Sequence, residues 1–154
     1  MQLSKNFYLY ELTASPTAKA LKISNIPDQC AIANLKLVAQ KILQPVRDYY
    51  KISFSPNSGY RCQELNRRVG GSRSSQHIEG KAVDFEVPGV TNYDLAVWCS
   101  KNLEFDQLIL EFYTLGVPDS GWVHCSYSQG KNRKQVMTAY KAGGKTNYKS
   151  GLLN

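Results

Sequence analysis

The chain has 154 residues, of which 42% are apolar and 20% charged, a composition typical of one globular domain with its own core. No apolar run approaches the roughly 18 residues that a membrane crossing requires, which excludes a transmembrane protein. The N-terminal segment, MQLSKNFYLYELTASP, lacks the continuous apolar stretch of a secretory signal, so we expect synthesis in the cytoplasm.

The net charge of +7 is concentrated at the C-terminal end. Residues 1–119 contain 13 basic and 12 acidic side chains, whereas residues 120–154 contain the other six basic side chains and no acidic one. A basic end attracts polyanions such as nucleic acid, an anionic cell-wall polymer or a membrane surface. A solvated tail without any partner is an equally good interpretation.

Helical patterns come first along the chain. Asp28 can cap a helix in which apolar residues recur at steps of three and four, and Pro45 should kink or divide that helix. The apolar positions are Ala31, Leu35, Val38, Ile42, Val46 and Tyr49. We predict a short strand at 52–57 and a short helix around 62–69.

The second half of the chain predicts strands at 82–87, 105–113, 122–127 and 133–140. A helix from about Asn92 to Lys101 follows a capping pair formed by Thr91 and Asp94. Strand alternation groups the most apolar side chains on one face, namely Val83, Phe85, Val87, Leu108, Leu110, Phe112, Val123, Cys125 and Tyr127. Helices first and strands later favour a single α+β domain over residues 1–140, with a mostly antiparallel sheet. Residues 141–154, rich in Gly, Lys and Asn, are predicted to form a basic flexible tail.

Four cysteines stand far apart in the sequence, at Cys30, Cys62, Cys99 and Cys125. The absence of any C-x-x-C pair argues against a cysteine-ligated zinc knuckle and against a dense disulfide scaffold. We favour buried free thiols over one or two disulfides.

Three predicted strands each carry a polar group on the face opposite their most apolar side chains: Asp84, Glu111 and His124. His77, the other histidine of the chain, precedes Asp84 by seven residues. Two imidazoles and one carboxylate form a ligand set that suits zinc and leaves a fourth position open for water. On the residues alone, two ordinary histidines and a salt-bridged strand acid explain the pattern equally well.

Two segments, SSQHIEGKAVDF and WVHCSY, resemble the zinc motifs of the D-alanyl-D-alanine carboxypeptidase family of metallopeptidases. That family also includes L-alanyl-D-glutamate endopeptidases, and SGYRCQELN at 58–66 resembles its S-G-Y-R-x-x-x-L-N segment. The chain is most similar to the small single-domain members found among bacteriophage and bacterial cell-wall enzymes. The resemblance extends over roughly residues 6–127. It implies that His77, Asp84 and His124 hold a zinc ion.

The general base is less directly indicated. Several members of the family place an acid three residues before the final histidine ligand, but here that position is Gly121. Asp119 and Glu111 are the remaining candidates ahead of His124. FDQLILE followed by a histidine-bearing strand is similar to the hedgehog amino-terminal domain, where the matching glutamate lies beside the metal. We therefore favour Glu111, and Asp119 is the alternative, with a turn role in VPDSG as its simpler explanation.

The resemblance also places Arg61 beside the metal, where a guanidinium could stabilise the oxyanion that forms when water attacks a carbonyl. A purely structural arginine is the alternative. Ser75 and Gln76 flank His77 and are expected to fix its loop. Together with Trp122, which should form a wall of the cleft, they are our predicted substrate-binding residues.

The resulting hypothesis is an endolysin-like, monomeric zinc peptidase that cuts peptidoglycan stem or cross-bridge peptides containing D-amino acids. It would reach the cell wall or periplasm by phage lysis or another route, and the basic end could bind an anionic wall polymer. One alternative is a zinc-bearing module that binds wall or partner without turnover. A nucleic-acid-binding protein built on the basic end is a less favoured alternative, since it leaves Glu111 and the open coordination position unexplained.

Overall fold

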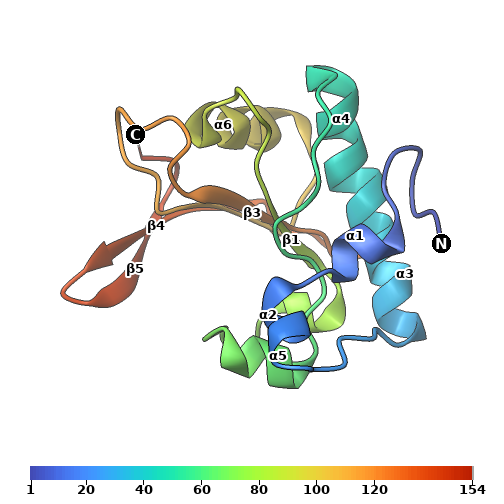
Figure 1. The fold of residues 1–154 in the computed structure, drawn as a ribbon. Helices are drawn as coiled ribbons and strands as arrows, with labels where there is room; N and C mark the ends of the chain where they lie inside the picture. Colours follow the sequence, from blue (N-terminus) through green and yellow to red (C-terminus); the bar gives the residue numbers. More distant parts are fainter. Residues whose placement is uncertain (154) are drawn as a thin grey trace.

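Helices fill the first half of the chain and strands most of the second, with one long helix between the first two strands (Figure 1). The computed structural model describes residues 1–153. In this range the helical elements are α1 (Leu9–Thr13), α2 (Pro16–Ala20), α3 (Gln29–Val38), the π-helical turn η1 (Ala39–Leu43), α4 (Gln44–Tyr50), α5 (Gln63–Arg68), the 3-10 turn η2 (Gln76–Glu79) and α6 (Asn92–Asn102). The strands are β1 (Ala82–Phe85), β2 (Gln107–Glu111), β3 (Trp122–Ser126), β4 (Gln135–Ala142) and β5 (Lys145–Ser150).

The predicted division of the long helix is confirmed. Asp28 caps α3, because its side chain accepts a hydrogen bond of 2.8 Å from the backbone of Ala31. Pro45 lacks an N–H and its ring crowds the preceding turn, so the chain passes through η1 before α4 begins. The extra residue of the π turn shifts the helical phase. As a result Tyr49 is 59% exposed, contrary to its predicted core position, and Tyr50 packs against the core.

The other two predicted helices also form. α5 covers most of 62–69, and α6 begins where Thr91 accepts a hydrogen bond of 3.0 Å from the backbone of Asp94. The strand predicted at 52–57 does not form. This segment contains Pro56, which has no N–H to donate, and pairing with β1 is confined to an isolated bridge between Ser58 and Asp84.

The strands form one sheet of five in the order β1-β3-β2-β4-β5 within residues 1–153. All neighbours are antiparallel except β2 and β4, which are parallel. This confirms the single α+β domain with a mostly antiparallel sheet. Helices α3 and α6 pack on the sheet face that carries Val83, Phe85, Leu108, Leu110, Val123 and Cys125. The opposite face of β1, β2 and β3 therefore stays free for polar side chains.

Phe112 departs from the predicted alternation. Its φ of +57° ends β2, and its ring lies 5.3 Å from that of Trp122, on the polar face of the sheet. Tyr113 packs against the core instead. Our assignment of Phe112 to the apolar face was wrong because a left-handed residue reverses the side-chain order that an extended strand would keep.

Residues 141–150 belong to a hairpin of the sheet, where the sequence predicted a flexible tail over 141–154, and residue 154 lies outside the described residues. β4 continues to Ala142, Gly143 and Gly144 form a two-residue turn with φ of +60° and +74°, and β5 pairs back along β4. A turn with positive φ at both positions is what a tight hairpin needs, so the glycines close a hairpin rather than loosen the chain. Figure 1 shows this hairpin projecting from the sheet, away from α3 and α4.

The four cysteines are free, as we predicted, but only Cys99 and Cys125 are buried, whereas Cys62 is half-buried and Cys30 is exposed. Among the helices of residues 1–153, none combines the length and apolar character that a membrane span requires.

Candidate metal centre

His77, Asp84 and His124 meet on the polar face of the sheet. Asp84 of β1 and His124 of β3 are directly paired in the antiparallel register, so their side chains share one face. His77 comes from the turn η2, which precedes β1. Oδ1 of Asp84 lies 3.3 Å from Nε2 of His77 and 2.9 Å from Nδ1 of His124. One ligand atom from each residue falls within 4.8 Å of the others, so the group could hold a metal ion.

A main-chain carbonyl orients the ring of His77. Nδ1 donates to the carbonyl oxygen of Gly59 at 2.6 Å, since a carbonyl can only accept. This leaves Nε2 buried and without a hydrogen-bond partner in the described chain. A Cβ at Gly59 would overlap the carbonyl oxygen of Leu12, so only glycine fits here. An oriented imidazole with a free, buried nitrogen fits a metal ligand.

The charges of the centre also fit a cation. Burial opposes ionisation of Asp84, but the two imidazoles beside it hold the pKa of its carboxyl well below the usual range. Burial lowers the pKa of His77 and outweighs the attraction of Asp84. The centre thus combines an ionised carboxylate with a neutral imidazole, the forms in which these groups donate electron pairs to a metal.

Hydrogen bonds also hold the turn that carries His77. Ser75 caps η2, with its hydroxyl 3.3 Å from the backbone nitrogen of His77, and Gln76 donates to Oδ2 of Asp106 at 2.9 Å. The sequence predicted that Ser75 and Gln76 fix this loop, but it did not identify Asp106 as the partner of Gln76. Asp106 is 5% exposed and also binds the guanidinium of Arg133, with a distance of 2.8 Å from Nη2 to Oδ2.

The Arg133 hydrogen bond is the main reason why the pKa of Asp106 falls to about 2. Asp106 therefore stays ionised at neutral pH and fixes the loop of His77 through the hydrogen bond from Gln76. The signal that could have revealed it is an acid immediately before a buried strand, a position where a bare charge needs a partner.

Glu111 lies on the same sheet face as the centre. Ile109 pairs with His124 in the register, and Glu111, two residues further along β2, pairs with Trp122. Burial, together with the negative charge of Asp84, raises the pKa of Glu111 to about 7. A carboxyl with this pKa exchanges protons near neutrality, which is the property a general base requires.

Arg61 approaches from the loop before α5. Its backbone nitrogen donates to the carbonyl oxygen of His77 at 3.1 Å. Burial lowers the pKa of its guanidinium, although Asp84 and Glu111 attract the charge, and Nε has no hydrogen-bond partner among residues 1–153. A buried, unpaired donor beside the centre is available to a ligand.

A cleft of about 590 Å³ opens on the centre. The structure brings together on its walls all the residues that we singled out, apart from Asp119: Arg61, Ser75, Gln76, His77, Asp84, Glu111, Trp122 and His124. Sequence reasoning missed the residues that line it from β4 and β5, because the hairpin itself was not predicted.

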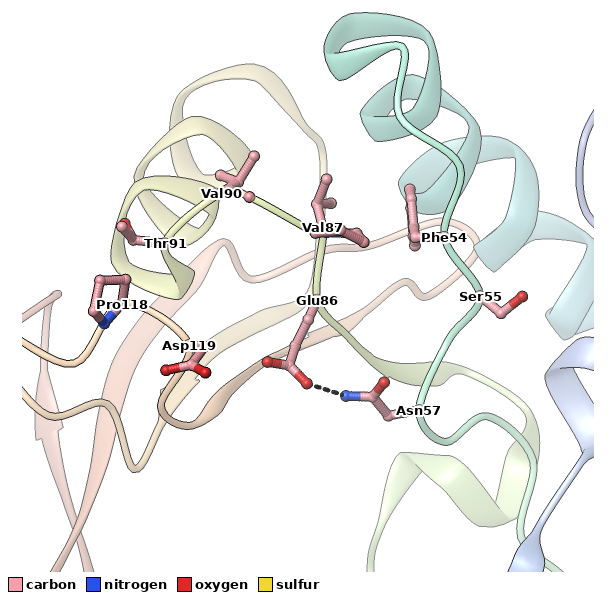
Figure 2. A pocket seen from close by; sticks show the side chains of 11 residues that line it. Phe54, Ser55, Asn57, Glu86, Val87, Val90, Thr91, Pro118 and Asp119 are labelled. Atoms are coloured by element: carbon pink, nitrogen blue, oxygen red, sulfur yellow. Dashed lines mark hydrogen bonds between the residues drawn. The ribbon is translucent and has the colours of Figure 1, made fainter.

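Asp119 lies elsewhere. It lines a separate pocket of about 440 Å³ with Phe54, Asn57 and Glu86, and none of the three candidate ligands reaches that pocket. Figure 2 shows Asp119 and Glu86 on the walls of this pocket, where the Glu86 carboxylate accepts a hydrogen bond of 2.9 Å from Asn57. The two candidate bases are thus on different cavities, and Glu111 is the one on the cleft of the candidate metal centre.

The fold and the site together define a class: an α+β protein whose sheet face carries a His-Asp-His group that could hold a metal at the base of a cleft. Comparison with family models then identifies the family. The Peptidase M15 model matches residues 6–126, and the chain belongs to this family of metal-dependent peptidases. This confirms the resemblance carried by the SGYR and SSQH segments. Comparison with curated proteins gives no match.

Proposed function

We propose that the chain is a zinc-dependent peptidase that hydrolyses peptidoglycan stem or cross-bridge peptides containing D-amino acids. The observation that carries the proposal is the buried, unpartnered Nε2 of His77 beside His124 and the carboxylate of Asp84, at the base of a cleft that also holds Glu111. Family membership supplies the reaction class, which is peptide hydrolysis.

Zinc is the ion that the donor set favours. Two imidazole nitrogens and one carboxylate oxygen are typical of catalytic zinc sites with one position left for water. Zinc bound to His77, Asp84 and His124 would supply Lewis acidity toward water and the peptide carbonyl. The Gly59 carbonyl keeps the tautomer of His77 in which Nε2 is free to bind.

Glu111 acts as the general base in this proposal. Its carboxylate lies on the cleft wall, on the sheet face that carries His124, where it can take a proton from the attacking water and return one to the leaving amine. Arg61 acts on the carbonyl, where its half-buried guanidinium stabilises negative charge on the oxygen. Trp122, Ser75 and Gln76 line the cleft and hold the peptide in position.

The substrate class comes from the resemblance of the SGYR, SSQH and WVH segments to peptidases of the bacterial cell wall. The proposed basic wall-binding surface now lies on an ordered hairpin, because Lys141, Lys145 and Lys149 belong to β4 and β5. The chain would act at the wall as a monomer.

Incubation of the zinc-loaded chain with purified peptidoglycan, followed by mass analysis of the released fragments, tests the proposal. We expect new peptide ends with wild type and none with Glu111→Gln, which keeps the shape of the side chain. Bound zinc without any released peptide would instead support the non-catalytic binding module. Fragments cut at a sugar linkage would contradict the peptidase proposal.

A further inference from the structure

The β4–β5 hairpin forms one wall of the cleft described above. Lys141, Thr146 and Tyr148 line the cleft together with the candidate metal ligands. In the register, Lys141 pairs with Thr146 and Ala139 pairs with Tyr148, so these side chains share one face of the hairpin. Lys145 and Lys149 lie one residue out of phase and project from the other face. Only one of the three hairpin lysines therefore faces the cleft.

Lys141 carries a positive charge that no acid offsets. Its ammonium donates to the hydroxyl of Thr146 at 3.1 Å and stands 5.4 Å from the ring centroid of Phe112. Among the described residues, no carboxylate lies within ion-pairing distance of it. The other cations of the cleft have acidic neighbours: Arg133 is paired with Asp106, and the charges of Asp84 and Glu111 attract the guanidinium of Arg61.

We propose that Lys141, Thr146 and Tyr148 form a subsite that binds a carboxylate of the peptide substrate. The proposal rests on the proposed function, since it assumes that a peptide occupies the cleft. An ammonium and two hydroxyls offer several donors to one carboxylate, and hydrogen bonds between oppositely charged groups are the strong ones. Carboxylates are the anionic groups that a peptide carries.

The position of Tyr148 puts this subsite beside the reacting groups. In the register Glu111 pairs with Ala139 and Ala139 pairs with Tyr148, so the side chains of Glu111 and Tyr148 lie on one face of the sheet, on either side of Ala139. A carboxylate held between Lys141 and Tyr148 would therefore lie next to the proposed base. It would fix the register of the peptide along the cleft.

The subsite lies outside the residues that the family model matches. The family match ends at residue 126, and β4 begins at Gln135. The motifs of the family supply the candidate ligands, whereas this wall comes from the chain's own C-terminal strands. The hairpin is accordingly placed to set substrate preference without altering the metal centre.

Binding of a matched peptide pair tests the subsite. The probes are a synthetic peptide containing D-glutamate and D-alanine with its carboxylates free, and the same peptide fully amidated. Calorimetric titration uses the full zinc-loaded chain carrying Glu111→Gln, so that hydrolysis does not interfere. We expect the free peptide to bind roughly tenfold more tightly than the amidated one, the least that a charge-assisted hydrogen bond contributes.

Lys141→Gln should remove this preference, whereas Lys145→Gln and Lys149→Gln, which lose the same charge from the other face, should keep it. Tyr148→Phe should reduce the preference for the free peptide two- to threefold without changing the charge of the subsite. The subsite proposal is overturned if the parent shows no preference or Lys141→Gln retains it. It is equally overturned if all three lysine variants lose it together, since that result indicates general attraction of polyanions.

The proposed function has a separate readout. The same peptides are incubated with the zinc-loaded chain without the Glu111 substitution, and cleavage is followed by mass spectrometry. A carboxylate preference without cleavage by this chain would overturn the peptidase proposal and leave the subsite standing. Cleavage without a carboxylate preference would overturn the subsite proposal and support the peptidase proposal.

Discussion

Gly121 lies so close to Glu111 that a Cβ at position 121 would overlap the carbonyl oxygen of Glu111. Gly121 also has a φ of +67°, a conformation that side chains disfavour. Position 121 is where several members of the family carry an acid before the final histidine. In this chain that position cannot hold a side chain without moving the end of β2. The absence of the acid at 121 and the proposed use of Glu111 as the base are thus consistent with one local geometry.

Gly121→Asp is therefore expected to lower the free energy of unfolding by roughly 2–4 kcal/mol, through backbone overlap and strain together. Urea denaturation measures it. Gly116→Asp is the matched control, because Gly116 has a φ of +84° but open space around its Cβ position. It should cost only about 1–2 kcal/mol. Equal losses in the two variants would show that the contact with Glu111 has no energetic weight.

The metal centre predicts stoichiometric zinc binding that depends on both histidines. His77→Ala and His124→Ala should each abolish retention of one zinc per chain, because two remaining ligands hold the ion poorly. Elemental analysis after dialysis measures it. Cys30→Ala serves as the control, since it removes an exposed thiol that could bind zinc adventitiously. Full occupancy in both histidine variants would mean that the ion binds elsewhere.

The proposed base predicts a separation of binding from catalysis. Glu111→Gln should retain zinc but lower the rate of peptide hydrolysis by roughly two to four orders of magnitude, the usual contribution of a general base. Initial rates on a soluble peptide, with zinc content measured in parallel, provide the check. Asp119→Asn should change the rate little, because Asp119 lies in the other pocket. The opposite pattern would make Asp119 the base.

The lowered pKa of Asp106 predicts that part of the free energy of unfolding depends on pH. Its pKa falls from an ordinary 3.8 to about 2 in the folded chain, mainly through the hydrogen bond from Arg133. A lowered folded-state pKa stabilises the fold above the unfolded-state pKa, and this stabilisation disappears as the pH falls through about 2. Asp106→Asn should therefore cost about 2 kcal/mol at pH 7 and progressively less between pH 4 and pH 2.

Urea denaturation at several pH values measures this difference between wild type and Asp106→Asn. Glu104→Gln is the control, because Glu104 is an exposed acid two residues away. A cost for Asp106→Asn that stays constant with pH would show that the charge of Asp106 contributes nothing and that its loss acts through packing.

Sequence alone determined the α+β class, most of the helices and strands, and the cluster of polar side chains on one face of the sheet. Strand periodicity is strictly two, so Asp84 and His124 had to lie opposite the apolar residues that pack on the helices. Helix ends were equally predictable at Asp28, Thr91 and Pro45, since capping and the missing proline N–H act within one turn. Each of these rules is local and can be read along the chain.

Tertiary structure decided which groups share a cavity. In the sequence, Glu111 and Asp119 were both candidates for the general base. Only the register of β2 with β3 put Glu111 on the cleft of the candidate centre. A single left-handed residue, Phe112, reversed the predicted faces at the end of β2. The pairing of β5 with β4 turned an apparent tail into a wall that carries Lys141. These outcomes depend on contacts between distant segments, which local patterns do not specify.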